Sequence, residues 1–477
     1  MVNLDRLFFP EHVCLIGASE AALRGVTPYL FALKKVNFNK PIYCVNRKKK
    51  KVMYGLDAYP SILDVPGDID YAIIGVPAEE VPQLIKECSQ KKVKYVTIFT
   101  AGFSELGTEK GEKLEAELMK NVTNNLRIIG PNCLGPYCQE SRLVNTEIFE
   151  IKEREGHVGY ICQSGGHTSA FYFIGENRGF PFNKVVSIGN QCDLTIQDFI
   201  EYFTTDPKIE VISCYIEQVK KSTQFLGILE ESSKKKPIIF WKGGHTIEGE
   251  LAAASHTGAM SSSYEIFQSA IKQHGGIITE SMEEMADLTL GALYLAPKKL
   301  GKNVGLVVAG GGASVELTDE VAKLGLNVPE LSLDTREKIR ELIPEVNTYD
   351  RNPVDLGMYG WFVSVFSKLI RYIAEDPKID ILIFQFMTER APQFAERLND
   401  RHIEKSFLKR IKRVVKTVSI PFICILPNFN IIDPEITKIR KAFIDELTNI
   451  EVPHFPSTYR AANVISKLIE YQKFLDK

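Results

Sequence analysis

The chain has 477 residues, of which 44% are hydrophobic and 25% are charged. This length predicts two to four domains, and the composition is typical of a folded globular protein rather than a disordered one. The 58 basic and 60 acidic residues give a formal net charge of -2, so the overall charge gives no reason to expect nucleic acid or a membrane surface as a partner.

The nine cysteines are scattered, and several lie inside apolar runs typical of strands. We expect them to be reduced thiols of a cytosolic protein. No cysteine or histidine cluster has the spacing of a zinc site, so no metal site is predicted. The sequence has no segment typical of a signal peptide and no run of about 18 apolar residues. We therefore expect a soluble, cytoplasmic chain.

The first segment alternates short β-branched runs with amphipathic helical patterns. The expected strands are residues 12–17, 41–46, 70–76, 93–99 and 127–130, and the expected helices are residues 78–92 and 108–122. Strict alternation of strands and helices predicts a parallel, doubly wound sheet. Ligands of such sheets bind beyond the carboxyl ends of the strands.

Small and turn-forming residues collect where these strands end. The residues at the ends of the first, third and fifth strands are Gly17, Ser19, Val76, Pro77, Asn132 and Cys133. Each turn taken alone is also explained as ordinary loop structure. Taken together, the turns predict one rim that binds a nucleotide-like ligand.

The second strand ends at Asn46, and a basic run of Arg47, Lys48 and residues 49–51 follows. The first turn lacks the GxGxxG fingerprint, and no acidic residue follows the second strand to hold a ribose hydroxyl. These features argue against NAD and favour a ligand with a ribose phosphate, either coenzyme A or NADP. A solvated turn is the other explanation of the basic run.

A second alternating segment has expected strands at residues 157–162, 182–189, 209–217 and 237–244. The first of them runs into Gln163, Ser164, Gly165 and Gly166, and an apolar helix follows. A strand, a glycine-rich turn and a helix start present backbone N–H groups to an anion. This turn is therefore a candidate phosphate site, although a plain tight turn explains it too.

His256 lies in the stretch AAASHTGAMSSS at residues 252–263, among small residues that leave room for a bulky anion. Neutral imidazole is a nucleophile near pH 7, so His256 is a candidate phosphoryl carrier; the alternative is a histidine in a polar loop. His167 and His245 are rival nucleophiles without such small neighbours. Glu217 ends a strand, where its carboxylate is placed to orient the ring and stabilise the cation that forms.

A third alternating segment begins near residue 301. Its expected strands include residues 303–312, 379–386 and 421–428, with a helix at residues 313–324. Gly310, Gly311 and Gly312 form a turn that opens this helix. The turn is either a second phosphate cradle or a structural βα turn.

One family shows many of these motifs in this order and spacing. They are IGAS near the start, VPAE at 76–79, AGFSELG at 101–107, GPNCLG at 130–135, QSGG at 163–166, YIE at 215–217, ASHTGAM at 254–260, AGGGASVELTDE at 309–320 and RNPVDLG at 351–357. Over nearly its full length the chain resembles the α subunit of ADP-forming acyl-CoA synthetases, of the acetyl-CoA synthetase type, which are related to succinyl-CoA synthetase.

The resemblance implies an α/β fold of three successive doubly wound parallel-sheet domains. These are a Rossmann-like CoA-binding domain at residues 1–145 and two flavodoxin-like ligase-CoA domains at residues 150–300 and 301–477. It also implies the reversible conversion of acyl-CoA, ADP and phosphate to acid, ATP and CoA through an acyl phosphate and a phosphohistidine. His256 matches the phosphorylated histidine, and Glu217 matches its supporting carboxylate.

The resemblance assigns ligand roles as well. The positions that match motifs of the CoA site are Gly17, Ser19, Val76, Pro77, Asn132 and Cys133. Ser164, Gly165 and Gly166 match the turn that holds phosphate. The chain departs from the family at two places: Arg47 and Lys48 follow Asn46 where Pro-Lys is common, and His167 stands where a small or apolar residue is usual.

The chain shows no segment resembling an ATP-grasp fold, so the resemblance implies a separate ATP-grasp β subunit that binds ADP or ATP with Mg²⁺, in an α2β2 assembly. The alternatives are a CoA-binding regulatory or scaffolding subunit without catalysis and an NADP-dependent dehydrogenase. The sequence leaves open which small organic acid and acyl-CoA are used, the physiological direction, and the choice of ADP over GDP.

Overall fold

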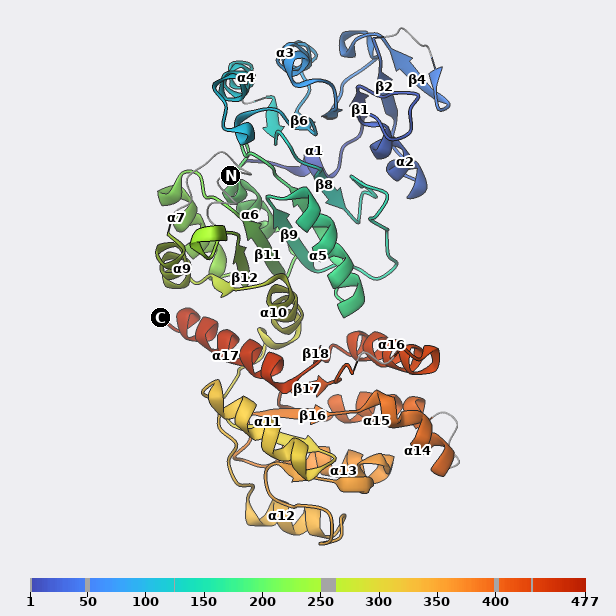
Figure 1. The fold of residues 1–477 in the computed structure, drawn as a ribbon, viewed down its shortest axis with the longest axis vertical. Helices are drawn as coiled ribbons and strands as arrows, with labels where there is room; N and C mark the ends of the chain where they lie inside the picture. Colours follow the sequence, from blue (N-terminus) through green and yellow to red (C-terminus); the bar gives the residue numbers. More distant parts are fainter. Residues whose placement is uncertain (1, 48–51, 124, 250–262, 399–402, 430–431) are drawn as a thin grey trace. The chain divides into compact units, whose positions relative to one another are not determined.

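The computed structural model describes residues 2–47, 52–123, 125–249, 263–398, 403–429 and 432–477. These residues form three sheets with helices between their strands (Figure 1). The chain divides into two compact units, Met1–Met285 and Ala286–Lys477. The first unit contains two of the sheets, and the second unit contains the third.

The first sheet has the strand order β3-β4-β2-β1-β5-β6-β7. Its strands are β1 (Val13–Ile16), β2 (Ile42–Val45), β3 (Val52–Met53), β4 (Leu56–Tyr59), β5 (Tyr71–Ile74), β6 (Tyr95–Ile98) and β7 (Arg127–Ile129). All neighbours pair in parallel except β3 and β4. Without β3, this is the order of a Rossmann fold, and its switch point lies between β1 and β5.

The helices of this segment pack on the sheet through apolar stripes. They include α2 (Thr27–Lys35), α3 (Val81–Gln90) and α4 (Glu109–Met119). In α3 the buried residues are Val81, Leu84, Ile85 and Cys88, which is the spacing that places side chains on one helical face. They join the strand residues in one core, and each such buried side chain stabilises the fold by about 1.5–3 kcal/mol.

The second sheet has the order β13-β12-β11-β9-β10-β8. Its strands are β8 (Gly135–Cys138), β9 (Val158–Cys162), β10 (Phe182–Ser187), β11 (Val211–Ile216), β12 (Ile238–Lys242) and β13 (Ile277–Thr279), and its helices include α5 (Gly165–Arg178), α6 (Ile196–Thr205), α7 (Ser222–Ser233) and α9 (Tyr264–Gln273). Helix α10 (Met282–Leu295) follows, and all but its first four residues belong to the second unit. Without β8 the order is flavodoxin-like, with its switch point between β9 and β11. The edge strand β8 pairs antiparallel with β10, so this sheet is not wholly parallel.

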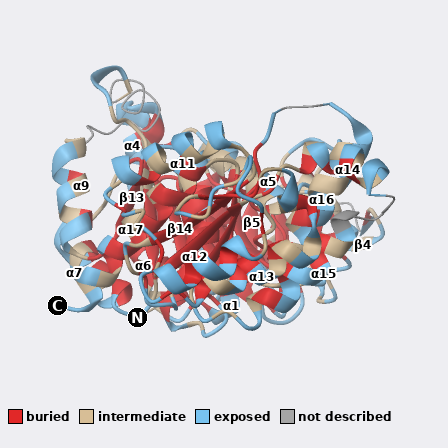
Figure 2. Cartoon of the chain, turned by 90° about the horizontal axis from the view of Figure 1, so that it is seen from below, coloured by how far each residue is buried: buried red, intermediate tan, exposed pale blue. Residues whose placement is uncertain are grey.

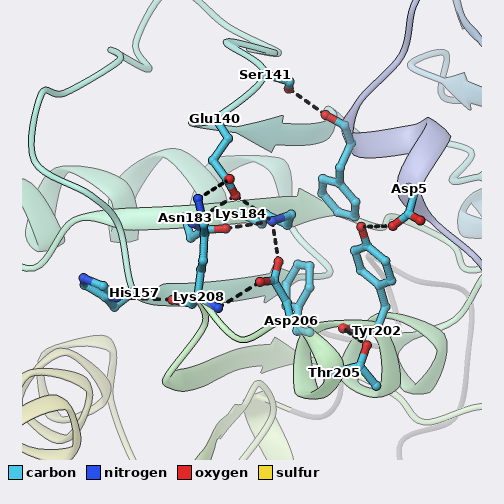
Figure 3. Close-up of polar contacts among 12 residues, drawn as sticks. Asp5, Glu140, Ser141, His157, Asn183, Lys184, Tyr202, Thr205, Asp206 and Lys208 are labelled. Atoms are coloured by element: carbon cyan, nitrogen blue, oxygen red, sulfur yellow. Dashed lines mark hydrogen bonds and ion pairs between the residues drawn. The ribbon is translucent and has the colours of Figure 1, made fainter.

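A buried charge network fixes β8 and the N-terminal helix α1 (Asp5–Phe8) to this sheet (Figure 3). Lys184 of β10 is fully buried, and its Nζ donates hydrogen bonds to Asp206 Oδ2 at 2.5 Å and Asn183 Oδ1 at 2.8 Å and lies 3.3 Å from Glu140 Oε1. Tyr202 Oη donates to Asp5 Oδ1 at 2.9 Å. Removing one partner of such a network leaves an unpaired buried charge, which is strongly destabilising.

The third sheet has the order β15-β14-β16-β17-β18, and all its pairings are parallel. Its strands are β14 (Val304–Val308), β15 (Val354–Asp355), β16 (Ile381–Gln385), β17 (Phe422–Ile425) and β18 (His454–Phe455), and its helices are α11 (Gly311–Lys323), α12 (Leu333–Arg340), α13 (Val363–Ala374), α14 (Ala391–Arg397), α15 (Ile403–Val415), α16 (Pro434–Asn449) and α17 (Thr458–Leu475). This order is again flavodoxin-like, with a switch point between β14 and β16.

In Figure 2 the strands are mostly red, and the helices turn pale blue faces outward, so each core lies between a sheet and its helices. The predicted α/β fold with mostly parallel sheets is confirmed. All nine cysteines are free thiols. Among the described helices, none combines the length and the apolar character that crossing a membrane requires.

Candidate functional site at the carboxyl edges of the sheets

Gly17 forms the turn after β1 at the switch point of the first sheet. Its φ is +96°, a conformation that favours glycine, and a Cβ at this position would lie 2.5 Å from the backbone oxygen of Gly75. Its N–H donates to Val45 O at 3.0 Å. Only glycine therefore allows the loops after β1 and β5 to approach this closely.

Ser19 and Asn46 hold the loop that follows. Thr27 Oγ1 accepts from the Ser19 N–H at 2.9 Å and donates to Ser19 O at 3.0 Å. Asn46 Nδ2 donates to Ala18 O at 2.6 Å, across the ends of β1 and β2. These contacts shape the rim that the sequence predicts as the CoA site.

Arg47 forms an ion pair with Glu80; the Arg47 side chain is exposed, and the Glu80 side chain is partly exposed. Such a pair contributes about 0–1 kcal/mol. An anionic ligand can therefore displace Glu80 from the Arg47 guanidinium at little cost in free energy. Lys48, the other predicted cation, lies outside the described residues.

The loops after β5 and β7 also meet at this rim. Val76 O accepts from Thr100 Oγ1 at 2.7 Å, and Thr100 O accepts from the Asn132 N–H at 3.0 Å. Pro77 directly precedes the 3-10 helix Ala78–Glu80. Cys133 is buried, and this burial raises the pKa of its thiol to about 12. Its thiol is therefore protonated near pH 7 and suits a packing role rather than a nucleophilic one.

The turn after β9 opens helix α5. Ser164 is the N-cap, and its Oγ accepts from the His167 N–H at 3.4 Å. Gly165 and Gly166 are the first two helical residues, whose N–H groups have no acceptor within the helix. This is the arrangement of a helix N-terminus that binds an anion.

Gln163 ties this turn to the end of β11. Its Oε1 accepts from the Glu217 N–H at 2.9 Å and from the Gln218 N–H at 3.2 Å. Glu217 is 8% exposed, and its Oε1 accepts from Tyr215 Oη at 3.2 Å. The structure thus brings together the predicted phosphate turn and the predicted carboxylate at the switch point of the second sheet. His256 lies outside the described residues.

His167 packs on Tyr215, the residue whose hydroxyl donates to Glu217. Its ring stacks on Tyr215 with centroids 4.4 Å apart and meets the Trp241 ring edge-on at 5.1 Å. Its Nδ1 lies 3.1 Å from Ser164 Oγ. Burial and the nearby charge of Glu217 raise the pKa of Tyr215. The rival histidine, His245, stacks instead on Tyr264, with centroids 4.5 Å apart.

One small cleft lies between the two sheet edges of the first unit; it spans about 310 Å³, part of which is open solvent. It is lined by Ser104, Glu105, Asn132, Gln163, Gly189, Asn190, Glu217 and Gln218. Asn132 belongs to the rim predicted for CoA, whereas Gln163 and Glu217 belong to the predicted phosphoryl site. Residues of the two predicted sites therefore line one and the same cleft.

The Gly310 turn belongs to the second unit. Gly310 has φ +138°, and its N–H donates to Asp355 Oδ1 at 2.7 Å. Helix α11 begins at the next residue, and a Cβ on Gly310 or Gly312 would meet no atom within 4 Å. Among the residues that the structure describes, no group of three or more histidine, cysteine or acidic side chains is placed to hold a metal ion.

Two domain families match the N-terminal part of the chain. Residues 11–139 match the CoA binding domain, and residues 155–290 match the succinyl-CoA ligase like flavodoxin domain. The chain is 34% identical to the α subunit of ADP-forming acetate–CoA ligase II from Pyrococcus furiosus over 412 residues, which cover 86% of this chain and 87% of that one. The chain belongs to the ADP-forming acetate–CoA ligase family.

Within this ligase family the chain corresponds to the α subunit. It is 32% identical to ADP-forming acetate–CoA ligase I from Archaeoglobus fulgidus, which it matches along 99% of its own length and 64% of the relative's length. In fold, it matches acetyl-coenzyme A synthetase 1 from Ca. Korarchaeum cryptofilum, solved in complex with phosphate and ADP. That match has a TM-score of 0.85 and 27% identity and covers 100% of this chain and 98% of that one.

Two further residues line the cleft, Glu105 and Asn190. Neither of them was identified as a site residue from the sequence. Asn190 Nδ2 donates to Glu105 Oε2 at 2.5 Å and to Glu115 Oε2 at 3.0 Å. Glu105 is also held by the Phe103 N–H at 3.1 Å. Glu105 lies inside the motif AGFSELG, and this motif is the sequence feature that could have identified Glu105 as a site residue. Asn190 follows a strand without any distinctive pattern.

Proposed function

We propose that this chain is the α subunit of an ADP-forming acyl-CoA synthetase. The enzyme converts acyl-CoA, ADP and phosphate to acid, ATP and CoA. The observation that carries the proposal is the cleft in which Asn132, Gln163 and Glu217 meet. The names of the relatives, which are acetate–CoA ligases, support acetate as the acid.

In the first proposed step, a phosphate oxygen attacks the thioester carbonyl carbon. The carbon–oxygen bond forms as the carbon–sulfur bond breaks, and CoA leaves as its thiolate. In the second step, a ring nitrogen of His256 attacks phosphorus, and the carboxylate of the acid leaves. The phosphoryl group then passes from His256 to ADP, so His256 is regenerated.

The residues around the cleft have distinct roles in these steps. Glu217 orients the His256 imidazole and stabilises the cation formed on phosphorylation. Gln163 holds the Glu217 backbone, and the N–H groups of the turn Ser164, Gly165 and Gly166 stabilise the phosphate charge. The Gln163–Glu217 hydrogen bond and the position of Ser164 as the N-cap of α5 support these assignments.

Coenzyme A is proposed to bind along the rim of the first sheet. The proposed contact residues are Gly17, Ser19, Asn46, Arg47, Lys48, Val76, Pro77, Asn132 and Cys133. The match of residues 11–139 to the CoA binding domain supports this assignment. Arg47, whose recorded partner among the described residues is the partly exposed Glu80, is placed to bind a CoA phosphate.

We further propose a partner subunit with an ATP-grasp fold, which binds ADP or ATP with Mg²⁺ in an α2β2 assembly in the cytoplasm. The designation of the Pyrococcus relatives as α subunits supports a partner. We also propose a CoA-binding domain at residues 1–145 and ligase-CoA domains at residues 150–300 and 301–477. In this division, the first segment contributes β8 to the second sheet.

The release of CoA thiol tests this proposal on the chain alone. Purified chain is mixed with acetyl-CoA, with or without phosphate, and free thiol is measured with a chromogenic disulfide. We expect about one thiol per chain, released only when phosphate is present. A regulatory or scaffolding subunit without catalysis would bind CoA and release no thiol with acetyl-CoA or any other acyl-CoA.

A further inference from the structure

His167 lies beside the proposed phosphate turn, and the proposed function gives it no role. It is the third residue of α5, so it belongs to the first turn of the helix whose leading N–H groups are proposed to hold phosphate. The family motif has a small or apolar residue at this position. The imidazole is therefore a chemical group that the family motif does not supply.

The ring of His167 is fixed by packing. It stacks on Tyr215 with centroids 4.4 Å apart and 13° between the planes, and it meets Trp241 at 5.1 Å and 70°. The backbone oxygen of His167 accepts a hydrogen bond from Tyr160 Oη at 3.4 Å. Because these contacts hold both the ring and the backbone, the fold sets the direction in which the ring nitrogens point.

The ring nitrogen Nδ1 points at the hydroxyl of the phosphate turn. It lies 3.1 Å from Ser164 Oγ, which also accepts from the His167 N–H at 3.4 Å. A hydroxyl has one donor hydrogen and two acceptor sites. In the neutral ring with its proton on Nε2, Nδ1 accepts this hydrogen. In the protonated ring, Nδ1–H donates to Oγ instead, and the hydroxyl hydrogen is free to donate to an anion.

A bound anion and a protonated ring favour each other at this position. The N-terminus of a helix carries partial positive charge, so it disfavours a cation nearby and favours an anion. A phosphate bound to the turn offsets this charge and makes protonation of the nearby ring more favourable. By linkage, protonation of the ring strengthens phosphate binding by the same factor.

The neighbours of His167 leave the ring as the group that titrates near neutral pH. Burial raises the pKa of Tyr215 and of Tyr160, so both stay protonated. Burial also raises the pKa of the Cys162 thiol, which donates to Ser164 O, to about 11. The acidic neighbour is Glu217, which accepts from Tyr215 Oη at 3.2 Å. Imidazole ordinarily changes its charge between about pH 5 and 8.

We propose that His167 is a positioning residue of the phosphate turn and that phosphate binding takes up a proton onto its ring. The proton comes from solvent and resides on Nδ1, which then directs the Ser164 hydroxyl toward the phosphate. This inference rests on the proposed function for the place where phosphate binds. The affinity of the turn for phosphate is highest while the ring is protonated and falls as the pH rises through the imidazole range.

Sulfate is the probe for this linkage, because it has the shape and charge of the phosphate dianion and does not itself titrate near neutral pH. The full chain carries His256→Ala, which removes the other imidazole assigned to this site. Calorimetry in two buffers of different ionisation heat counts the protons taken up. We expect about half a proton or more per bound sulfate near pH 7. The Kd should be at least about fivefold higher at pH 8 than at pH 6.

Variants of this parent chain assign the proton to the ring. His167→Leu and His167→Gln, which both lack a titratable ring, should take up no proton and show a Kd independent of pH. The control is His157→Leu, since His157 directly precedes β9 at its amino end, whereas the phosphate turn follows its carboxyl end. This control should keep the proton uptake. At pH 6 the effects of Ser164→Ala and His167→Leu on the Kd should not multiply, because His167 acts through Ser164.

Equal proton uptake in the parent chain and in His167→Leu would overturn the proposal, as would the lack of saturable sulfate binding in the parent. Effects that simply multiply in the double variant would exclude action through Ser164. The outcome is separable from that of the proposed function. If wild-type chain releases thiol from acetyl-CoA while proton uptake does not depend on His167, the role of His167 fails and the synthetase assignment stands. If proton uptake depends on His167 and no acyl-CoA releases thiol, the synthetase assignment fails.

Discussion

Gln163 Oε1 accepts a hydrogen bond from the Glu217 N–H at 2.9 Å and thereby joins the loops after β9 and β11. These loops flank the switch point of the second sheet, where the strand order places a ligand site. The carboxylate proposed to orient His256 is thus positioned by a residue of the proposed phosphate turn.

Replacing Gln163 should uncouple these two loops. Gln163→Leu leaves the Glu217 and Gln218 N–H groups without their acceptor, and an unpaired buried donor costs about 1–3 kcal/mol. We expect the phosphate-dependent release of CoA thiol to slow at least about tenfold, as the same energy raises the barrier. Gln163→Glu keeps an acceptor and should be slowed less, and the exposed Gln83→Leu serves as the control. Equal rates in all three variants would contradict the positioning role.

Removing the Glu217 charge should impair phosphorylation of His256 more than it impairs folding. Glu217→Gln keeps an oxygen for the Tyr215 hydroxyl, which donates to Glu217 at 3.2 Å, but it no longer stabilises an imidazolium. We expect the initial rate of phosphohistidine formation to fall at least about 100-fold. A variant with wild-type phosphorylation would exclude this role.

Gly17 offers a matched pair of substitutions. Gly17→Ala places a Cβ 2.5 Å from Gly75 O at φ +96°, whereas Gly55→Ala has φ +78° and no atom within 4 Å. Both variants carry the strain of a positive φ, about 1–2 kcal/mol. Only Gly17→Ala must also separate the loops after β1 and β5. We expect calorimetry to show loss of CoA binding in Gly17→Ala and retention in Gly55→Ala, so equal affinities would contradict the predicted rim.

The Lys184 network predicts a defined acid sensitivity. Burial alone would raise the pKa of Asp206, but the hydrogen bonds from Lys184 and the Lys208 N–H, together with the charges of Lys184 and Lys236, hold the pKa below its ordinary value. A lowered pKa stabilises the fold above the ordinary carboxyl range and loses that contribution as the pH falls through the folded-state pKa. Asp206→Asn should therefore be less stable at pH 7 and should lose less stability between pH 5 and pH 2, roughly the carboxyl range. Denaturant unfolding across this range measures the difference.

Removing Lys184 from the same network should lower the free energy of unfolding. Lys184→Met removes the buried cation and leaves Asp206 and Glu140 near each other without it. We expect unfolding free energy to fall by about 3–5 kcal/mol. The double variant Lys184→Met with Asp206→Asn should recover part of this loss. Two losses that simply add would show that these side chains do not interact.

The sequence was sufficient to predict the positions of the long apolar strands and the residues at their ends. All five strands expected in residues 12–130 are present, and Gln163 and Glu217 meet as expected at neighbouring strand ends. Periodicity identified these elements because buried parallel strands are continuous apolar runs. The same pattern explains why Gly17 and Val76 fall at one switch point.

The sequence did not predict the short strands or the hydrogen bonds between polar side chains of the cleft. Strands such as β15 and β18 have only two residues each, too few to show any period. The antiparallel edge strand β8 contains Pro136 and follows a turn, so it lacks a distinctive strand pattern. Asn190 reaches Glu105 and Glu115 through tertiary structure alone.

The most direct test of the account is mass spectrometry of the chain after mixing with acetyl-CoA and phosphate, kept at alkaline pH because phosphohistidine is labile in acid. We predict one phosphate on His256 in the wild-type chain and none in His256→Ala. Glu217→Gln should carry much less at early times. Phosphate on another residue, or equal phosphorylation of wild type and His256→Ala, would contradict the assignment of His256 as the phosphoryl carrier.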